Sequence, residues 1–212
     1  KSDFIAIYGR RRVGKTYLVR SVFENKLTFQ VTAMAKTSLK SQLKNFYKAL
    51  NKTDKLNQYK PTENWFDALD DLAKFLENSE DHKKVIFIDE LPWFDSQNSG
   101  FIQALDHFWN SWASTRTDIL LIVCGSAASW MINKLINNEG GLHNRVTKRI
   151  KVIPFTLKEC KIFIENKNAA IDNYQIIQLY MVFGGIPYYW DEISTEYSAM
   201  QNIANIWFAR IG

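Results

Sequence analysis

The chain has 212 residues, of which 46% are hydrophobic and 14% aromatic, and its formal net charge is +5. This length suggests one globular core with a small appended part, and the apolar content is enough to fill such a core. Only two cysteines are present, Cys124 and Cys160, and neither stands near a histidine cluster. The sequence therefore argues against a disulfide framework and a zinc site, and it favours a reducing, cytoplasmic location.

The longest uncharged apolar stretch covers residues 119–132 and is interrupted by Gly125, Ser126 and Ser129. It is too short and too polar to span a membrane, so no membrane partner is expected. No signal peptide is visible, and the chain begins so close to its first motif that we expect a trimmed piece of a longer protein. The mild positive charge fits a basic surface as well as nucleic-acid binding.

Short apolar runs alternate with amphipathic stretches from the N-terminus onward, the pattern of a parallel α/β sheet. The expected strands are residues 4–8, 28–32, 84–89, 119–124 and 149–153. The expected helices are residues 15–23, 38–50, 64–76, 101–114 and 127–136. We therefore expect a five-stranded parallel nucleotide-binding sheet flanked by helices over residues 1–153, with ligands at the C-terminal ends of the strands.

The character of the sequence changes at Pro154, after which no further strand is expected. Helical patterns occupy residues 157–166, 174–183 and 198–211, and residues 184–187 (Gly-Gly-Ile-Pro) indicate a turn. Residues 154–212 are therefore expected to form a small helical lid that the chain does not complete.

The strongest motif lies between the first expected strand and the first expected helix. It follows the phosphate-binding loop pattern G-x-x-x-x-G-K-[ST], with Tyr17 directly after it. The motif residues are Gly9, Arg10, Arg11, Arg12, Val13, Gly14, Lys15 and Thr16. Glycines let backbone N–H groups surround a polyphosphate at a helix N-terminus, while the lysine reaches the β- and γ-phosphates and the Thr16 hydroxyl holds Mg²⁺. The sequence predicts a nucleoside triphosphate site.

A second acidic element closes the apolar run of residues 85–88. Asp89 is placed to hold Mg²⁺ through its water shell, and Glu90 to polarise a water molecule for attack on the γ-phosphate. The alternative for Glu90 is an exposed charge at a strand end. A carboxylate beside the metal-holding aspartate favours hydrolysis over a small-molecule kinase.

Ser126 follows the next expected strand and could hydrogen-bond the attacking water or a γ-phosphate oxygen. Alternatively, it caps the helix that begins at residue 127. An arginine that meets the developing charge often completes such sites, from the same or a neighbouring chain. Arg145 is the first candidate for this role, with Arg149 and Arg210 behind it.

Together these motifs resemble the prokaryotic, archaeal-type ATPase family of the AAA+/STAND division of P-loop proteins. The matching segments are residues 8–16, 87–93 (Phe-Ile-Asp-Glu-Leu-Pro-Trp), 124–126, 130–131, 154–155 and 184–189 (Gly-Gly-Ile-Pro-Tyr-Tyr). The resemblance implies an AAA+-like P-loop NTPase core with a helical lid, ATP as the nucleotide, and a place for Pro187 near that nucleotide.

The chain departs from the family pattern at three points. The segment that usually precedes the first strand and the winged-helix or nuclease-like region that usually follows the lid are both missing, which supports a trimmed chain. Asn144 stands where a glycine commonly precedes the arginine matched by Arg145, which weakens the case for that arginine.

Four functions are weighed. An ATP-hydrolysing switch that repositions the lid leads, followed by a slowly hydrolysing nucleotide-binding scaffold or sensor. A DNA-associated motor or loader gains some support from the basic charge, and a kinase is disfavoured by Glu90 and the helical tail. Whether ATP is preferred to GTP, which protein or DNA partner is used, and whether the protein forms an oligomer stay open.

Overall fold

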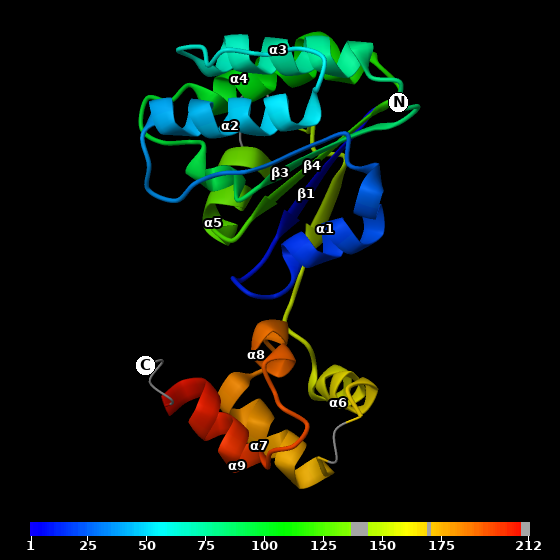
Figure 1. Ribbon diagram of the computed structural model, residues 1–212, viewed down its shortest axis with the longest axis vertical. Coiled ribbons are helices and arrows are strands. Elements are labelled where there is room, and N and C mark those ends of the chain that lie inside the picture. Colours follow the sequence, from blue (N-terminus) through cyan, green and yellow to red (C-terminus); the bar gives the residue numbers. More distant parts are fainter. Residues whose placement is uncertain (137–143, 169–170, 209–212) are drawn as a thin grey trace. The chain divides into compact units, whose positions relative to one another are not determined.

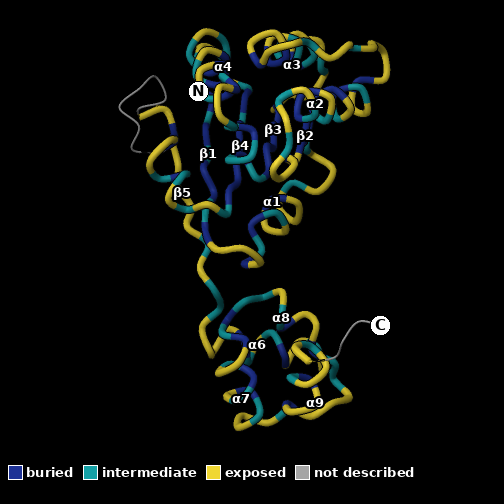
Figure 2. Tube along the Cα trace, turned by 90° about the vertical axis from the view of Figure 1, so that its left-hand side faces the viewer, coloured by how far each residue is buried: buried dark blue, intermediate teal, exposed yellow. Residues whose placement is uncertain are grey.

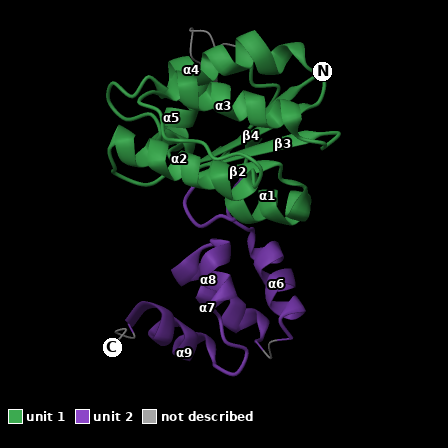
Figure 3. Ribbon diagram, turned by 45° about the horizontal axis from the view of Figure 1, so that its top comes forward, with its two compact units in different colours: residues 1–9, 15–151 green, residues 10–14, 152–212 purple. Residues whose placement is uncertain are grey.

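The computed structural model describes residues 1–136, 144–168 and 171–208. It divides into two compact units (Figure 3). The core unit comprises residues Lys1–Gly9 and Lys15–Lys151, and the helical unit comprises residues Arg10–Gly14 and Val152–Gly212. The sequence did not predict that five residues of the phosphate-loop motif would belong to the helical unit.

The core unit contains a five-stranded, all-parallel sheet in the order β2-β3-β4-β1-β5. Figure 1 labels β1, β3 and β4 of this sheet, and Figure 2 also labels β2 and β5. Its strands are β1 (Asp3–Tyr8), β2 (Phe29–Thr32), β3 (Lys84–Asp89), β4 (Ile119–Gly125) and β5 (Lys148–Lys151). The predicted five-stranded parallel sheet is confirmed. The largest difference is at β5, which ends two residues earlier than expected, before the chain enters the helical unit.

The helices of the core unit lie between its strands along the sequence. They are α1 (Lys15–Phe23), α2 (Leu39–Thr53), α3 (Trp65–Asn78), α4 (Phe101–His107) and α5 (Ala128–Trp130). Ser38 caps α2 and Asn64 caps α3, each by accepting from the backbone three residues on. The predicted helix 101–114 is composite, because a π-helical segment, Phe108–Trp112, follows α4.

Alternate strand residues on one face of the sheet pack with α2, α3 and α4 in one apolar core. The strand positions that contribute are Phe4, Ala6, Phe29, Val31, Ile86, Ile88, Ile119, Leu121 and Val123. Trp65 of α3 is fully buried there, with ring-centroid distances of 4.8 Å to Phe94 and 5.0 Å to Phe101. Figure 2 shows the buried strands β1, β3 and β4 inside this unit. The core holds the central strands and therefore their C-terminal ends.

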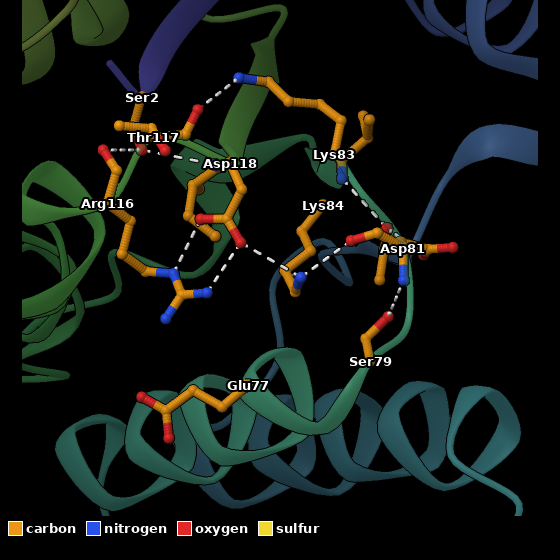
Figure 4. A network of polar contacts seen from close by, with 12 residues as sticks. Ser2, Glu77, Ser79, Asp81, Lys83, Lys84, Arg116, Thr117 and Asp118 are labelled. Atoms are coloured by element: carbon orange, nitrogen blue, oxygen red, sulfur yellow. Dashed lines mark hydrogen bonds and ion pairs between the residues drawn. The ribbon is translucent and has the colours of Figure 1, made fainter.

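A polar network occupies the opposite, N-terminal ends of β3 and β4 (Figure 4). The guanidinium of Arg116 donates to both carboxylate oxygens of Asp118, at 2.9 and 2.7 Å, and Lys84 Nζ lies 3.1 Å from Asp118 Oδ2. Ser2 ties the start of β1 to this network by donating its hydroxyl to the Arg116 carbonyl at 2.9 Å. The bidentate pair orients the Asp118 carboxylate, and the ion pair with Lys84 joins the start of β3 to the start of β4.

The helical unit has its own small core, formed by Cys160, Ile164, Ile176, Leu179, Phe183, Trp190, Ile193 and Ala199. Its helices are α6 (Leu157–Asn166), α7 (Asn173–Phe183), α8 (Pro187–Asp191) and α9 (Ala199–Ile203). Thr156 and Glu159 form a capping box at α6. Helix α8 was not predicted, since the sequence indicated only a turn ending at Pro187. In the described part of the chain no helix is both long and apolar enough to cross a membrane.

Candidate functional site

Three adjacent strands bring the predicted motifs to one edge of the sheet. Gly9 follows β1, Asp89 ends β3, and Ser126 follows β4, which lies between the other two. Because the three strands are parallel, their C-terminal ends meet at the same edge, where ligands bind in open α/β sheets. The fold therefore places the lysine-bearing loop, the acidic pair and the serine together.

The phosphate-loop motif adopts the unusual backbone that its glycines allow. Gly9, Arg12 and Gly14 have φ angles of 155°, 65° and 88°. Successive residues of mixed handedness turn N–H groups toward a common centre and form an anion-binding concavity. The side chains of Arg10, Arg11 and Arg12 are exposed, whereas that of Val13 is buried.

Lys15 begins helix α1 and is 6% exposed, which is unusual for a lysine. Its ammonium donates to the carbonyl of Gly9 at 3.1 Å. This contact holds the positive charge of Lys15 beside Gly9, at the C-terminal end of β1. Tyr17, the third residue of α1, is 76% exposed.

Thr16 and Asp89 are in direct contact. The threonine hydroxyl donates to Asp89 Oδ2 at 2.8 Å, and Asp89 is only 4% exposed. Burial raises the pKa of the Asp89 carboxyl, although the hydroxyl of Thr16 and the N–H of Glu90 favour its charged form. The two oxygens predicted to serve a metal are thus adjacent at the end of β3.

Glu90 takes the left-handed conformation, with φ 51° and ψ 41°. Its Oε2 accepts the hydroxyl of Ser126 at 2.9 Å and the Ser126 N–H at 3.4 Å. Glu90 is therefore not the free strand-end charge that the sequence left open. Nor does the Ser126 hydroxyl cap α5, whose N-cap residue is Ala127 with no side-chain cap bond.

Gly125 lets the segment after Glu90 approach strand β4. A methyl group on Gly125 would lie 2.6 Å from Met131 Sδ and 2.9 Å from Pro92 Cδ. Both distances are shorter than the non-bonded contacts that a real Cβ atom makes, so glycine is the residue that fits beside Met131 and Pro92. The neighbouring thiol of Cys124 is fully buried, and burial raises its pKa well above the ordinary value, so it stays protonated.

Gln42 of α2 supports this edge, and sequence reasoning missed it. Its amide nitrogen donates to the carbonyls of Met34 and Trp93 at 2.7 and 2.9 Å, and its oxygen accepts the Met34 N–H at 3.1 Å. The fully buried side chain thus joins the loop after β2 to the turn after Glu90. The sequence offered one signal for it: Gln42 is a polar residue at a position of α2 that faces the apolar core.

Arg145 is not brought to these residues within one chain. It precedes β5 and lies with Lys1 and Ser2, near the N-terminal end of β1, whereas Gly9 follows the opposite end. Arg149 lies on β5, where its side chain is exposed. Arg210 lies outside the described residues.

Pro187 is the first residue of α8 in the helical unit. Its fixed φ suits that position, where no N–H is required. The two tyrosines that follow it contact Arg12 of the same unit.

Comparison with known proteins gives a family match over most of the chain. A family model described as "ATPase domain predominantly from Archaea" matches residues 1–193. An uncharacterized protein of Methanocaldococcus jannaschii is 28% identical over 195 residues, which make up 92% of this chain and 40% of that protein. The chain thus spans two fifths of the length of this curated relative.

Solved structures share the fold at low sequence identity. The Walker-type ATPase of Pyrococcus abyssi matches with a TM-score of 0.64 and 16% identity, covering 96% of this chain and 67% of the other. The Aeropyrum pernix ORC2 protein, solved as ADPNP–ADP complexes, matches with a TM-score of 0.65 and 14% identity, covering 100% and 63% of the two chains. Both support the P-loop NTPase fold.

Proposed function

The chain belongs to the ATPase-domain family found predominantly in Archaea, and on that premise we propose that it is a Mg²⁺-dependent ATPase whose reaction cycle works as a switch. Nucleotide binding is the coarse function of the family. The observation that carries the finer proposal is the meeting of Lys15, Thr16, Asp89, Glu90 and Ser126 at one sheet edge. Cation, metal ligands and general base are the groups that phosphoryl transfer to water requires.

The residues at the end of β3 fit a magnesium ion. Mg²⁺ prefers oxygen ligands, keeps several waters and takes only one or two protein oxygens, which the Thr16 hydroxyl and the Asp89 carboxylate supply. We assign these two residues to the metal, which would supply positive charge to the phosphates of the substrate. A bound cation would also offset the desolvation of the buried Asp89 carboxylate.

Glu90 is proposed as the general base. Its carboxylate accepts a proton from water as the water oxygen bonds to the γ-phosphorus and the bond to the β,γ-bridging oxygen breaks, giving ADP and phosphate. Oε2 is already held by Ser126, while Oε1 accepts no hydrogen bond from the described residues. Lys15 and the N–H groups of residues 9–16 would bind the phosphates of the substrate.

Single-turnover hydrolysis of ATP by the wild-type chain, Glu90→Gln and Lys15→Ala tests the proposal, with bound nucleotide quantified in each. Glu90→Gln should retain ATP and lose about 10²-fold or more in hydrolysis rate, because general-base catalysis contributes that much. Lys15→Ala should weaken ATP binding about 30-fold, the equivalent of one charge-assisted contact of about 2 kcal/mol. Unchanged hydrolysis by Glu90→Gln would remove Glu90 as the base.

The switch is the finer part of this proposal. The five loop residues that cluster with the helical unit would report the state of the nucleotide to that unit. A slowly hydrolysing scaffold or sensor is the alternative, and tight binding without hydrolysis in the wild-type chain would favour it. Pro187 near the nucleotide, Arg145 acting from a neighbouring chain of an oligomer, and a cytoplasmic location stay predictions from the sequence.

A DNA-associated role is the second candidate, favoured by the basic edge strand of the core unit. Arg145, Lys148, Arg149 and Lys151 are all exposed, and none forms an ion pair within the described ranges. Without these four charges the net charge of +5 would fall to +1. A phosphate backbone would satisfy them, and its binding should weaken steeply with salt.

The test compares the wild-type chain with Lys148→Gln/Arg149→Gln/Lys151→Gln for binding to duplex DNA at several salt concentrations. The variant should bind more weakly with a shallower salt dependence. Lysine on an exposed sheet edge also discourages strand pairing between molecules. If binding did not depend on salt, or if the variant bound as the wild type does, the DNA role would be contradicted. The basic residues would then be explained by protection of the sheet edge against strand pairing.

A further inference from the structure

Arg12 makes a concentrated set of contacts inside the helical unit. Its guanidinium carbon lies 4.5 Å from the ring centroid of Tyr188 and 5.5 Å from that of Tyr189, and its Nη1 donates to the Tyr189 hydroxyl at 2.9 Å. The backbone takes part as well, because the Arg12 carbonyl accepts the N–H of Tyr188 at 3.4 Å. Two side chains and one backbone group therefore hold a single loop residue.

The backbone conformation of Arg12 is unfavourable by itself, so contacts that stabilise it are important. Its φ of 65° lies in the left-handed region, which a residue with a long side chain seldom occupies. Strained backbone of this kind persists when surrounding contacts over-determine it, and it clusters at functional sites. The contacts with Tyr188 and Tyr189 are of that type. They stabilise the backbone that the phosphate-loop motif needs in order to point its N–H groups at one centre.

Tyr189 and the residue after it pack against other residues of the helical unit. Tyr189 stacks on Phe183 of α7 with ring centroids 5.7 Å apart and an interplanar angle of 22°, and it packs against Trp207 at 5.6 Å. The next residue, Trp190, is fully buried, and its indole N–H donates to the Gly184 carbonyl at 2.6 Å. Tyr189 therefore packs on the core of the helical unit, whereas Tyr188 is 45% exposed and contacts the Tyr189 ring with centroids 5.5 Å apart.

We infer that Tyr188 and Tyr189 are positioning residues of the nucleotide site, which act through Arg12 by holding the phosphate loop in its binding conformation. The inference rests on the proposed binding of ATP at this loop. Neither tyrosine touches the substrate in this role. A loop held in advance binds its ligand more tightly, because less ordering is left for the binding step. The same contacts would carry a nucleotide-dependent movement of the loop into α8.

The test is a double-mutant cycle between Arg12→Gln and Tyr188→Leu, read as dissociation constants for Mg·ATP and Mg·ADP. Each single variant should weaken ATP binding about 3- to 10-fold, the range of a cation–π contact and its associated hydrogen bond. The double variant should lose no more than the stronger single variant, because both substitutions remove the same contact. Independent losses that multiply would overturn the inference.

Conservative variants separate positioning from folding. Tyr188→Phe keeps the aromatic face and should restore wild-type affinity, whereas Tyr189→Phe removes only a hydroxyl and should lose about 3-fold. Tyr174→Leu, at a 69% exposed tyrosine of the same unit, should leave ATP affinity unchanged. Equal losses in Tyr188→Phe and Tyr188→Leu would overturn the proposed cation–π contact.

Measuring ATP binding by Lys15→Ala alongside the cycle tests the nucleotide site separately from the role of the two tyrosines. Loss of ATP binding in Lys15→Ala, together with multiplying effects in the cycle, would leave the nucleotide site standing and overturn only the role of the tyrosines. Wild-type affinity in Lys15→Ala would contradict the nucleotide site itself, and the positioning role would fall with it.

Discussion

Ser126 donates both its hydroxyl and its backbone N–H to one oxygen, Oε2, of Glu90, at 2.9 and 3.4 Å. The two residues are 36 positions apart in sequence and meet because each follows one of two adjacent parallel strands. Glu90 is further constrained by its left-handed backbone and by its N–H, which donates to Asp89 Oδ1 at 3.0 Å. The carboxylate of Glu90 is thus held in one orientation at the sheet edge.

Ser126→Ala should slow single-turnover hydrolysis about 5-fold while leaving ATP affinity near that of the wild type. The substitution removes the stronger of two donors to Glu90, worth about 1 kcal/mol, and keeps the N–H. Ser126→Thr retains the hydroxyl and is the control. A fall in ATP affinity with an unaltered hydrolysis step would assign Ser126 to a phosphate contact instead.

Thr16→Val should abolish the effect of Mg²⁺ on ATP affinity, whereas Thr16→Ser should keep it. Valine has the shape of threonine without the hydroxyl that now contacts Asp89 at 2.8 Å. Titration of ATP with Mg²⁺ and with a chelator present measures the difference for each variant. Equal Mg²⁺ dependence in the valine and serine variants would show that the Thr16 oxygen is not a metal ligand.

Gly185→Ala should destabilise the helical unit by about 3 kcal/mol or more. The added methyl group would lie 1.7 Å from the backbone carbonyl oxygen of Phe155. The backbone N–H of Phe155 donates to the Gly185 carbonyl at 2.7 Å, so the two segments are held close together. Met181→Ala, at an 81% exposed position of the same unit, is the control and should change stability little. Chemical denaturation followed by tryptophan fluorescence would measure both, and equal stabilities would contradict the close packing.

Asp118→Asn should destabilise the core unit by about 2 kcal/mol at neutral pH, because Asp118 accepts three charge-assisted contacts. The hydrogen bonds from Arg116, with help from Lys84, hold the pKa of Asp118 well below its usual range. A depressed folded-state pKa stabilises the protein above the unfolded-state pKa of about 3.9 and loses that effect as the pH falls further.

The stability difference between the wild type and Asp118→Asn should therefore be constant above about pH 5 and shrink below about pH 4. Urea denaturation across this pH range measures it. Lys74→Gln removes an exposed pair with Asp71 and is the control, since such pairs contribute little. A difference that persists unchanged at low pH would show that Asp118 acts by packing and not by charge.

The sheet and three of its site elements could be predicted from sequence because their signals are local. Runs of apolar residues such as 85–88 mark buried strands, and the glycine-rich motif at 9–16 carries its own turn chemistry. Parallel strands then bring Gly9, Asp89 and Ser126 to one edge without further information. The expected helices 38–50 and 64–76 begin at Ser38 and Asn64, which the structure shows to be the capping residues of α2 and α3.

Other features depend on contacts between residues far apart in the chain. Whether the Ser126 hydroxyl would cap a helix or hold Glu90 was decided by the relative position of β3 and β4. The order of the strands placed Arg145 near the N-terminal end of β1, away from the other site residues of the same chain. Gln42 gave only a weak signal, because a single polar residue in a helix face has many explanations.

The sequence by itself predicted the candidate residues for the chemistry of this ATPase domain: the glycine loop with its lysine, and the acidic pair at a strand end. Such motifs work through residues adjacent in the chain, so their spacing suffices to identify them. Only the tertiary structure decided how Glu90 is held and that Arg12 lies against Tyr188 and Tyr189, 176 and 177 positions away. Those contacts arise from packing, which brings together segments that no local pattern connects.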